Sequence, residues 1–400
     1  MDKVPPEIAR MICHVLRTED LSRLSRCNQF FNDISKNVMY SNINIIIGPT
    51  GLKNSAKRLL NLLVHNTQKR CAIRSLRIRE SVSYTWNRDE TGLLRILISI
   101  ILKGSSVLEF SWIVTEDIPH HALHSYSPPC QHQSLTQFSI PSILTSLTFI
   151  GSVNDWDVHF PNIRNLQCGR VQSAQQLSWI NWHIRNCKLT KLKVAMRPIA
   201  RYIYTNIKVE LLLMLKIIAG SYSLKTLVLE AVSVELLDTR QLVLLEHLGL
   251  RRCEGISSLL SKTVLGRPIM LKTLDLVVTE QSTSCIAQFV VWLAQFTKLE
   301  ELSLILLGSH DAFPLDPVLL HAQALRRLVL DSRTRIQDPT TIIRYTIADL
   351  KKITENCPLL LALGISVLLE ASGSYGPPRG PRRFEALVRS CLYRLMLPVN

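Results

Sequence analysis

The segment "LKTLDL", residues 271–276, has the form L-x-x-L-x-L, and the interpretation of the whole chain starts from it. Leu274 and Leu276 are two residues apart, so in a β-strand both side chains point to the same face. Leu271 comes three residues earlier and is expected to pack the turn before the strand. A short strand with one apolar face cannot bury that face alone, so the segment predicts neighbours of the same kind.

Segments of this form recur along most of the chain. They end at Ile78, Phe110, Phe149, Cys168, Val194, Leu229, Leu250, Leu276, Leu304, Leu330 and Ile365. Six of the ten steps between them span 19 to 28 residues, close to the roughly 20–29 expected of leucine-rich repeats. The longer steps predict insertions, with the longest near residues 115–135. Residues 71–370 are therefore expected to form about 9–11 irregular units.

Helical patterns occupy several of the stretches between these segments. In "CIAQFVVWLAQF" (285–296), apolar residues return every three or four positions and form one face. The segments 208–220 and 342–353 show a similar period. Strand–helix units stack because stacking buries the apolar face that each leaves open. We therefore predict an α/β fold, namely a curved leucine-rich-repeat solenoid with a parallel β-sheet on the concave face.

The residues between the leucines are expected to face out of this sheet, where a ligand would bind. These positions lean basic, which is compatible with an acidic or phosphorylated protein ligand, whereas an ordinary solvated surface is the preferred interpretation of each position taken singly. The substrate-facing candidates are Arg77, Lys193, Lys225, His247, Lys272, Glu301, Arg326 and Arg327.

The N-terminal segment "VPPEIARMICHVLRTEDLSRLSRCNQFFNDI", residues 4–34, has a different pattern. Pro5 and Pro6 suit the first turn of a helix, and apolar residues then return at a helical period through Leu16. A second helical stripe starts at Leu21. Helices this short bury little surface, so they need a partner or an attached domain to complete their core.

This spacing resembles the F-box, as found in fungal proteins. The matching positions are Val4, Pro5, Glu7, Ile8, Ile12, Leu16, Asp20, Leu21, Leu24, Cys27 and Phe30, with valine at position 4 where leucine is usual. The resemblance implies that the helices dock on a Skp-type adaptor of an SCF cullin–RING ubiquitin ligase, and that the repeats present a protein substrate for ubiquitination. The adaptor contacts it implies are Val4, Pro5, Ile8, Ile12, Leu16, Leu21, Leu24, Cys27, Phe30 and Phe31.

The resulting organisation has F-box helices at 1–45, a linking helix at 46–70 and the repeats at 71–370. Residues 371–383, rich in Gly, Pro and Arg, predict a flexible linker, and residues 384–400 predict a helix that caps the repeats. Two alternatives stay open. The chain could be a repeat scaffold whose N-terminal helices are only a cap, or a basic protein associated with nucleic acid.

The charge distribution bears on the second alternative. The formal net charge is +16, with +11 over residues 1–200 and +5 over residues 201–400. No dense Lys/Arg run with interleaved aromatic residues accompanies it, so the sequence favours a protein partner over nucleic acid.

Signals for enzymatic chemistry are weak throughout the sequence. No phosphate-binding loop, nucleophile elbow or H-E-x-x-H helix occurs, so we predict a non-enzymatic protein without catalytic residues, cofactor or metal. The cluster His120, His121, His124, Cys130 and His132 could hold zinc, but its spacing fits no standard zinc site and a polar loop is the preferred interpretation. Scattered cysteines without a CxxC pair, a missing signal peptide and the lack of an apolar membrane span predict a cytoplasmic or nuclear location.

Overall fold

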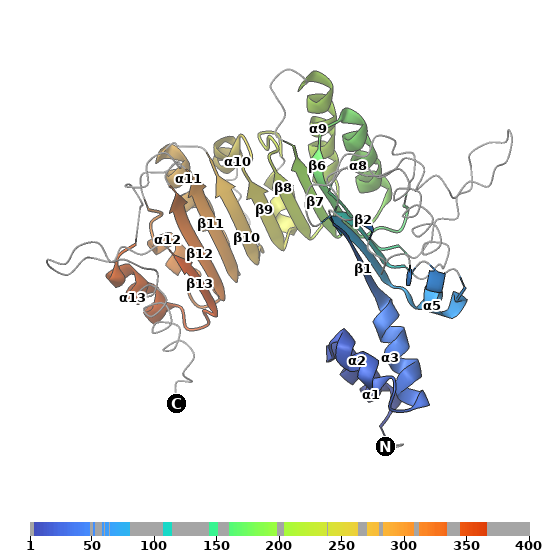
Figure 1. The fold of residues 1–400 in the computed structure, drawn as a ribbon. Helices are drawn as coiled ribbons and strands as arrows, with labels where there is room; N and C mark the ends of the chain where they lie inside the picture. The colour runs from blue at the N-terminus through green and yellow to red at the C-terminus, as the bar shows by residue number, and fades with distance from the viewer. Residues whose placement is uncertain are drawn as a thin grey trace. The chain divides into compact units, whose positions relative to one another are not determined.

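The structure, a computed structural model, divides into two compact units, Met1–Met214 and Leu215–Asn400. Figure 1 shows the path of the chain. The residues that the structure describes are 4–48, 51–52, 58–59, 61–63, 65–80, 107–113, 144–150, 160–197, 204–237, 239–262, 270–279, 283–307, 312–333 and 345–365.

The first unit begins with three helices and continues as a sheet. Its described elements are α1 (Pro6–Val15), α2 (Thr18–Leu24), α3 (Gln29–Ser41), β1 (Asn42–Gly48), β2 (Gly51–Leu52), α5 (Thr67–Ala72), β3 (Ser75–Glu80), β4 (Glu109–Ile113), β5 (Ser146–Ile150), β6 (Asn165–Val171), α8 (Ala174–Asn186) and β7 (Lys191–Met196). The strands lie in the order β2-β1-β3-β4-β5-β6-β7. The short β2 is antiparallel to β1, and the other neighbours are parallel.

The second unit repeats one strand and one helical segment along its length. The division between the units falls within α9 (Tyr204–Ala219). The elements that follow are β8 (Thr226–Glu230), η1 (Thr239–Leu244), β9 (His247–Arg251), α10 (Ile256–Lys262), β10 (Thr273–Val278), α11 (Thr283–Leu293), β11 (Glu301–Leu307), α12 (Asp316–Leu319), β12 (Arg327–Arg333), α13 (Ile347–Asn356) and β13 (Ala362–Ile365). Strands β8 to β13 pair in chain order, and all are parallel.

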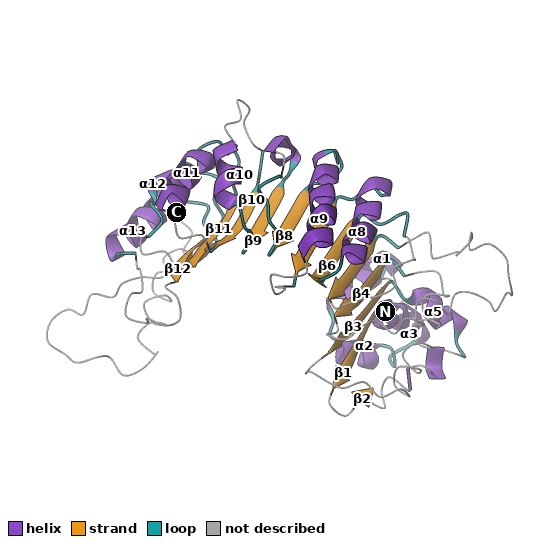
Figure 2. Cartoon of the chain, turned by 90° about the horizontal axis from the view of Figure 1, so that it is seen from above, coloured by secondary structure: helices purple, strands orange, loops and turns teal. Residues whose placement is uncertain are grey.

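The repeated leucines explain this arrangement. In the second unit Leu248, Leu274 and Leu302 occupy matching positions on neighbouring strands, and all three are buried. Figure 2 shows that the helices of this unit lie on one side of its strands. The predicted α/β fold with a parallel sheet is therefore confirmed for the described residues, and the side chains between the leucines lie on the face without helices.

The structure corrects the prediction at two strands. The segment predicted to end at Phe110 is shifted by two residues, because Phe110 pairs with Leu76 and Trp112 pairs with Ile78. Both aromatic residues are buried, whereas Leu108 lies before the strand. Strand β1 was not predicted. Its Ile43, Ile45 and Ile47 alternate into the core without the upstream leucine that the search pattern requires.

The predicted boundaries also differ from the structure. The parallel pairing of β1 with β3 starts at Asn42, so residues 42–45 belong to the sheet and not to the N-terminal helices. The predicted linking helix at 46–70 contains the end of β1, strand β2, helical residues at 58–59 and 61–63, and the start of α5. The predicted insertion near 115–135, the linker at 371–383 and the capping helix at 384–400 lie outside the described residues.

A left-handed backbone conformation recurs at the ends of strands. Arg170 lies at the end of β6, and Ala231 and Arg252 directly follow β8 and β9, with φ angles of 57°, 54° and 52°. This region costs non-glycine residues about 1–2 kcal/mol each. The turn geometry of the repeat therefore imposes one conformation on different side chains.

Among the glycines that the structure describes, Gly255 has a left-handed backbone, with φ at 76°. A Cβ there would collide with the Glu235 Cγ and lie 3.1 Å from the Glu235 backbone nitrogen. We expect Gly255→Ala to lower the free energy of unfolding by about 2 kcal/mol, measured by urea denaturation. Gly220→Ala is the control, since its Cβ would meet only the Ile217 carbonyl oxygen at 3.6 Å. Equal effects of the two variants would contradict the prediction.

We expect His321 to make the stability of the second unit depend on pH. It is buried, and its Nε2 lies 3.1 Å from the Leu293 carbonyl oxygen, to which Nε2–H donates. Burial lowers the pKa of His321 below its usual 6.5, although the hydrogen bond to Leu293 partly opposes the shift. Because the unfolded state then binds a proton more readily, stability that is present above about pH 6.5 is lost as the pH falls below it.

The size of this effect can be measured against His321→Gln. Between about pH 7.5 and pH 5.5 we expect the wild type to lose up to about 1.4 kcal/mol more unfolding free energy than the variant. Urea denaturation at both pH values measures the difference. Equal losses in the two proteins would show that His321 is not the titrating group.

Candidate functional site

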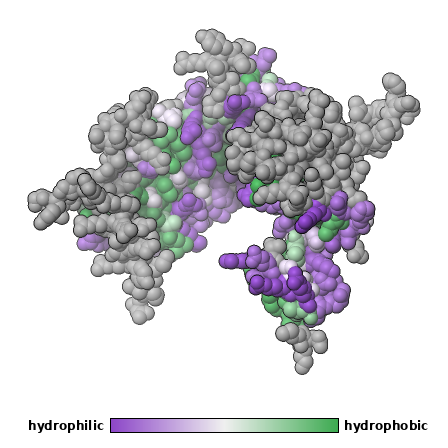
Figure 3. All heavy atoms as spheres, in the orientation of Figure 1, coloured by the Kyte–Doolittle hydropathy of each residue, from purple (hydrophilic) through white to green (hydrophobic). Residues whose placement is uncertain are grey.

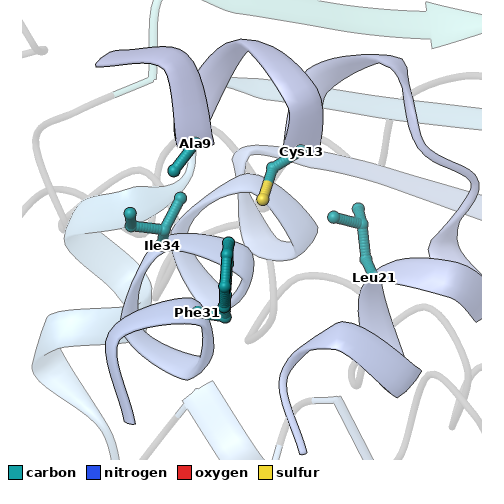
Figure 4. Close-up of a cluster of buried hydrophobic side chains, with 5 residues drawn as sticks. All are labelled: Ala9, Cys13, Leu21, Phe31 and Ile34. Carbon is teal, nitrogen blue, oxygen red and sulfur yellow. The ribbon is translucent and has the colours of Figure 1, made fainter. Parts of the chain in front are cut away.

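Helix α1 carries two apolar stripes on different faces. The inner stripe is formed by Ala9 and Cys13, both fully buried, and it continues to Leu16. Figure 4 shows Ala9 and Cys13 pointing toward Leu21, Phe31 and Ile34. These side chains form the core that holds the three N-terminal helices together.

The other face of α1 remains at the surface. We call its four apolar residues the outer α1 stripe, with exposed fractions of 46% for Ile8, 65% for Met11, 43% for Ile12 and 83% for Val15. In Figure 3, hydrophobic residues lie at the surface of the N-terminal helices. Single exposed apolar residues are common on protein surfaces and need no explanation. Four large apolar side chains together on one helical face are instead typical of a surface that binds another molecule.

The predicted adaptor contacts divide between these two environments. Leu21 and Phe31 are buried in the core of the three helices, so they hold the helices together. The partly buried residues packed against this core are Val4, Leu16 and Leu24. The predicted contacts at the surface are Pro5, Ile8, Ile12, Cys27 and Phe30. A partner can therefore reach only part of the predicted set.

Met11 and Val15 are surface residues that the predicted contact set leaves out. They lie three and seven positions after Ile8, which places them on the same helical face. The helical period already contained this signal. Motif matching passed over it because neither position belongs to the matched pattern.

The ends of the helices follow the local sequence. Pro5 is the N-cap of α1 and Pro6 its first residue, as the proline pair predicts. The side chain of Asn28 caps α3 by accepting a hydrogen bond of 2.8 Å from the Phe31 N–H. This cap fixes the first turn of α3, from which Phe31 enters the core and Phe30 stays exposed.

The open strand faces contain five of the eight predicted substrate-facing residues. In the first unit Arg77 of β3 and Lys193 of β7 belong to one row across the strands. In the second unit His247, Glu301 and Arg327 belong to one row. The structure thus places these residues in two separate rows, one in each unit, and Arg77 and Lys193 lie at opposite ends of theirs.

Lys225, Lys272 and Arg326 lie elsewhere, immediately before strands β8, β10 and β12. At this strand-start position each backbone carbonyl accepts N–H groups from the next repeat. The corresponding positions before β9 and β11 hold Glu246 and Glu300, so the charge alternates from one repeat to the next. The three cations contact these two glutamates. The Nζ of Lys272 lies 2.9 Å from Glu246 Oε2, that of Lys225 lies 3.8 Å from Glu246 Oε1, and Arg326 Nε lies 3.9 Å from Glu300 Oε2.

These contacts alter the ionisation of the charged groups. The hydrogen bond from Lys272 lowers the pKa of the Glu246 carboxyl, and the same bond raises the pKa of Lys272. Both side chains therefore stay charged at neutral pH. The three cations at strand starts are engaged with neighbouring repeats, which makes them weaker candidates for binding a substrate.

The open face of the second unit is hollowed over a volume of about 470 Å³. The small side chain of Ser303 lies in its lining, between the longer side chains of Glu301 and Ile305. The Nε of Arg251 donates to the Asp275 carboxylate at 2.9 Å. The charges lining the hollow are Glu230, Asp275 and Glu301 against Arg251, Arg252 and Arg327, so its wall is electrically balanced.

Signs of metal or membrane chemistry are not seen in the part of the chain that the structure describes. Within these ranges no group of three or more His, Cys, Asp or Glu side chains could hold a metal ion. The cluster from His120 to His132 falls in the gap between 113 and 144. Among the described helices, none combines the length and apolar character needed to cross a membrane.

No protein-family model matches the chain, and no curated protein matches it significantly. Any functional argument therefore depends on the residues and geometry of this chain.

Proposed function

We propose that this chain is a substrate-recognition subunit of an SCF-type cullin–RING ubiquitin ligase. In this role the helices α1–α3 bind a Skp-type adaptor, and the repeat strands hold a protein that is to be ubiquitinated. The observation that carries the proposal is the outer α1 stripe, which stays exposed although the three helices already have a closed core.

The energetics of the stripe support a protein partner. Fully burying one large aliphatic side chain contributes about 1.5–3 kcal/mol. Ile8, Met11, Ile12 and Val15 are 43–83% exposed, so a groove that covers all four would gain about twice that amount. A helix that lays one apolar face into a groove is a common mode of protein recognition. The resemblance of the N-terminal residue spacing to the F-box indicates that this partner is a Skp-type adaptor.

The junction between the helices and the sheet fits the same role. The Ser41 carbonyl oxygen accepts a 2.8 Å hydrogen bond from the Arg74 N–H. The Nζ of Lys69 lies 5.0 Å from the centre of the Tyr40 ring, which joins α5 to α3. These contacts connect the proposed adaptor-binding helices to the first repeat strands without a long flexible linker. In a substrate-recognition subunit of this kind the partner proteins carry out the ubiquitin transfer.

The decisive experiment is a titration of the full chain against a purified Skp-type adaptor. We expect binding with a dissociation constant of about 1 µM or below, measured by isothermal titration calorimetry. No binding at about 100 µM adaptor would overturn the proposal. The chain would then be a repeat scaffold whose N-terminal helices cap the first strand.

A further inference from the structure

The strand surface of the first unit has an unusual charge composition. Its described side chains, counted on the open face of β1 and β3–β7 and at the strand-start positions, include six cationic groups and one acidic group. The cations are Arg74, Arg77, Arg79, Arg164, Lys191 and Lys193, and the acid is Glu109. Arg77, Arg79 and Lys191 are exposed. This surface therefore presents a positive field to solvent.

The second unit shows that the repeat does not require such a field. Its strand-start residues alternate in sign, from Lys225 through Glu246, Lys272 and Glu300 to Arg326. On its open face Arg251 pairs with Asp275. The same architecture thus carries balanced charge in one unit and excess positive charge in the other. The excess in the first unit is a property of its side chains and not of the fold.

The cations of the first unit are concentrated on two strands. Arg77 and Arg79 project from β3, while Lys191 and Lys193 project from β7, four strand steps away. At about 4.8 Å per step, the two groups are roughly 19 Å apart. An extended peptide covers this distance with about six residues.

The middle row between the two cationic groups carries neutral polar side chains. The row that joins Arg77 to Lys193 contains Ser111, Thr148 and Gln167. The next row contains Ile113 and Ile150, which offer an apolar strip beside it. Glu109 is in the row on the other side, so an acidic group in the middle of a ligand would be repelled.

We propose that this face of the first unit, β3 to β7, binds an extended peptide with acidic groups about six residues apart and a neutral centre. The inference rests on the proposed function, since the peptide would belong to the protein that the ligase receives. Arg77 and Arg79 contact one acidic group, and Lys191 with Lys193 contacts the other.

Nucleic acid fits this face less well than a peptide. The described open-face side chains of β1 and β3–β7 include no aromatic ring, on which bases stack in single-strand binding proteins. Glu109 also interrupts the positive surface, whereas a nucleic acid backbone carries charge along its whole length. The apolar strip of Ile113 and Ile150 suits a side chain of a peptide.

The test measures binding of the full chain to a labelled peptide by fluorescence anisotropy at about 50 mM salt. The probe is fluoresceinyl Asp-Asp-Ser-Ala-Leu-Ser-Asp-Asp, in which the acidic pairs are six residues apart. The matched control peptide, Ser-Ala-Asp-Asp-Asp-Asp-Leu-Ser, has the same composition with its charges in the centre. The protein variants are Arg77→Glu with Lys191→Glu, and the control Arg252→Glu with Arg327→Glu in the second unit. Both variants change the net charge equally.

We expect the first-unit variant to bind the probe at least about tenfold more weakly, and the second-unit control to bind within about twofold of the wild type. The centre-charged peptide is expected to bind at least about threefold more weakly than the probe. Equal weakening by both variants, or no measurable binding of the probe, would overturn the proposal. A labelled eight-nucleotide thymidine oligomer that binds more tightly than the probe and is lost in the first-unit variant would also overturn it, in favour of nucleic acid.

The same variants separate this inference from the proposed function. Arg77→Glu with Lys191→Glu leaves the outer α1 stripe intact, so its adaptor titration should match the wild type. If the wild type binds the probe but not the adaptor, the ligase role fails and the peptide site stands. If it binds the adaptor but not the probe, the peptide site fails and the ligase role stands.

Discussion

The chain carrying Ile12→Asp and Val15→Asp will bind a Skp-type adaptor at least about 100-fold more weakly than the wild type, because two carboxylates would be buried without partners. Both side chains are exposed in the outer α1 stripe, so the substitutions remove no contact from the core of the three helices. Calorimetric titration measures the loss. Circular dichroism and the thermal unfolding midpoint check that the variant is folded.

The matched control changes two exposed β-branched aliphatic residues on other helices. Val209→Asp on α9 with Val291→Asp on α11 replaces two valines that are similarly exposed. We expect this control to bind the adaptor like the wild type. Wild-type binding by the Ile12 and Val15 variant would show that the outer α1 stripe is not the docking face. Substitutions at Leu21 or Phe31 are less informative, because they would disrupt the helices themselves.

Trp112→Ala is expected to lower the free energy of unfolding by about 3–5 kcal/mol, the largest stability loss predicted for this chain. The Trp112 side chain is fully buried on β4, in register with Ile78 of β3 and Phe149 of β5. Its removal leaves a cavity that the neighbouring repeats can fill only in part. Urea denaturation followed by circular dichroism measures the loss.

The neighbouring residue provides the control for the register of this strand. Ile113 lies one position later, on the open face, and is only partly buried. We expect Ile113→Ala to cost less than about 1.5 kcal/mol, because little cavity forms at a partly solvated site. A larger loss for Ile113 than for Trp112 would mean that β4 is shifted by one residue, which would place every side chain on the opposite face.

The N-terminal helices show where reasoning from the sequence was incomplete. Helical periodicity predicted one apolar stripe on α1, and motif matching selected its larger residues. The structure instead buries Ala9 and Cys13, whereas Ile8 and Ile12 remain at the surface. The small side chains of Ala9 and Cys13 allow α1 to lie close to the other two helices, and they are therefore the residues that are buried. A prediction of burial from hydrophobicity alone would place Ala9 and Cys13 below Ile8 and Ile12.

The charged positions show a second difference. Lys272 and Thr273 are adjacent in the sequence, and both are variable positions of the repeat pattern. Thr273 is the first residue of β10 and lies on the open face. Lys272 lies immediately before the strand and contacts Glu246. A shift of one residue therefore separates a possible ligand contact from an ion pair between repeats. The pattern L-x-x-L-x-L does not mark where the strand begins.

The amino-acid sequence was sufficient to predict the repeated parallel strands and the helices between them, because alternating and 3.6-residue apolar periods are local properties. It also predicted a short helical segment before the repeats and the excess of positive charge in the first half. Three-dimensional packing was needed to separate the inner and outer faces of α1, to add β1 to the sheet and to correct the register of β4. The same packing divided the cations between an exposed face and paired strand starts. These features depend on which residues of distant segments lie side by side, and no local period contains that information.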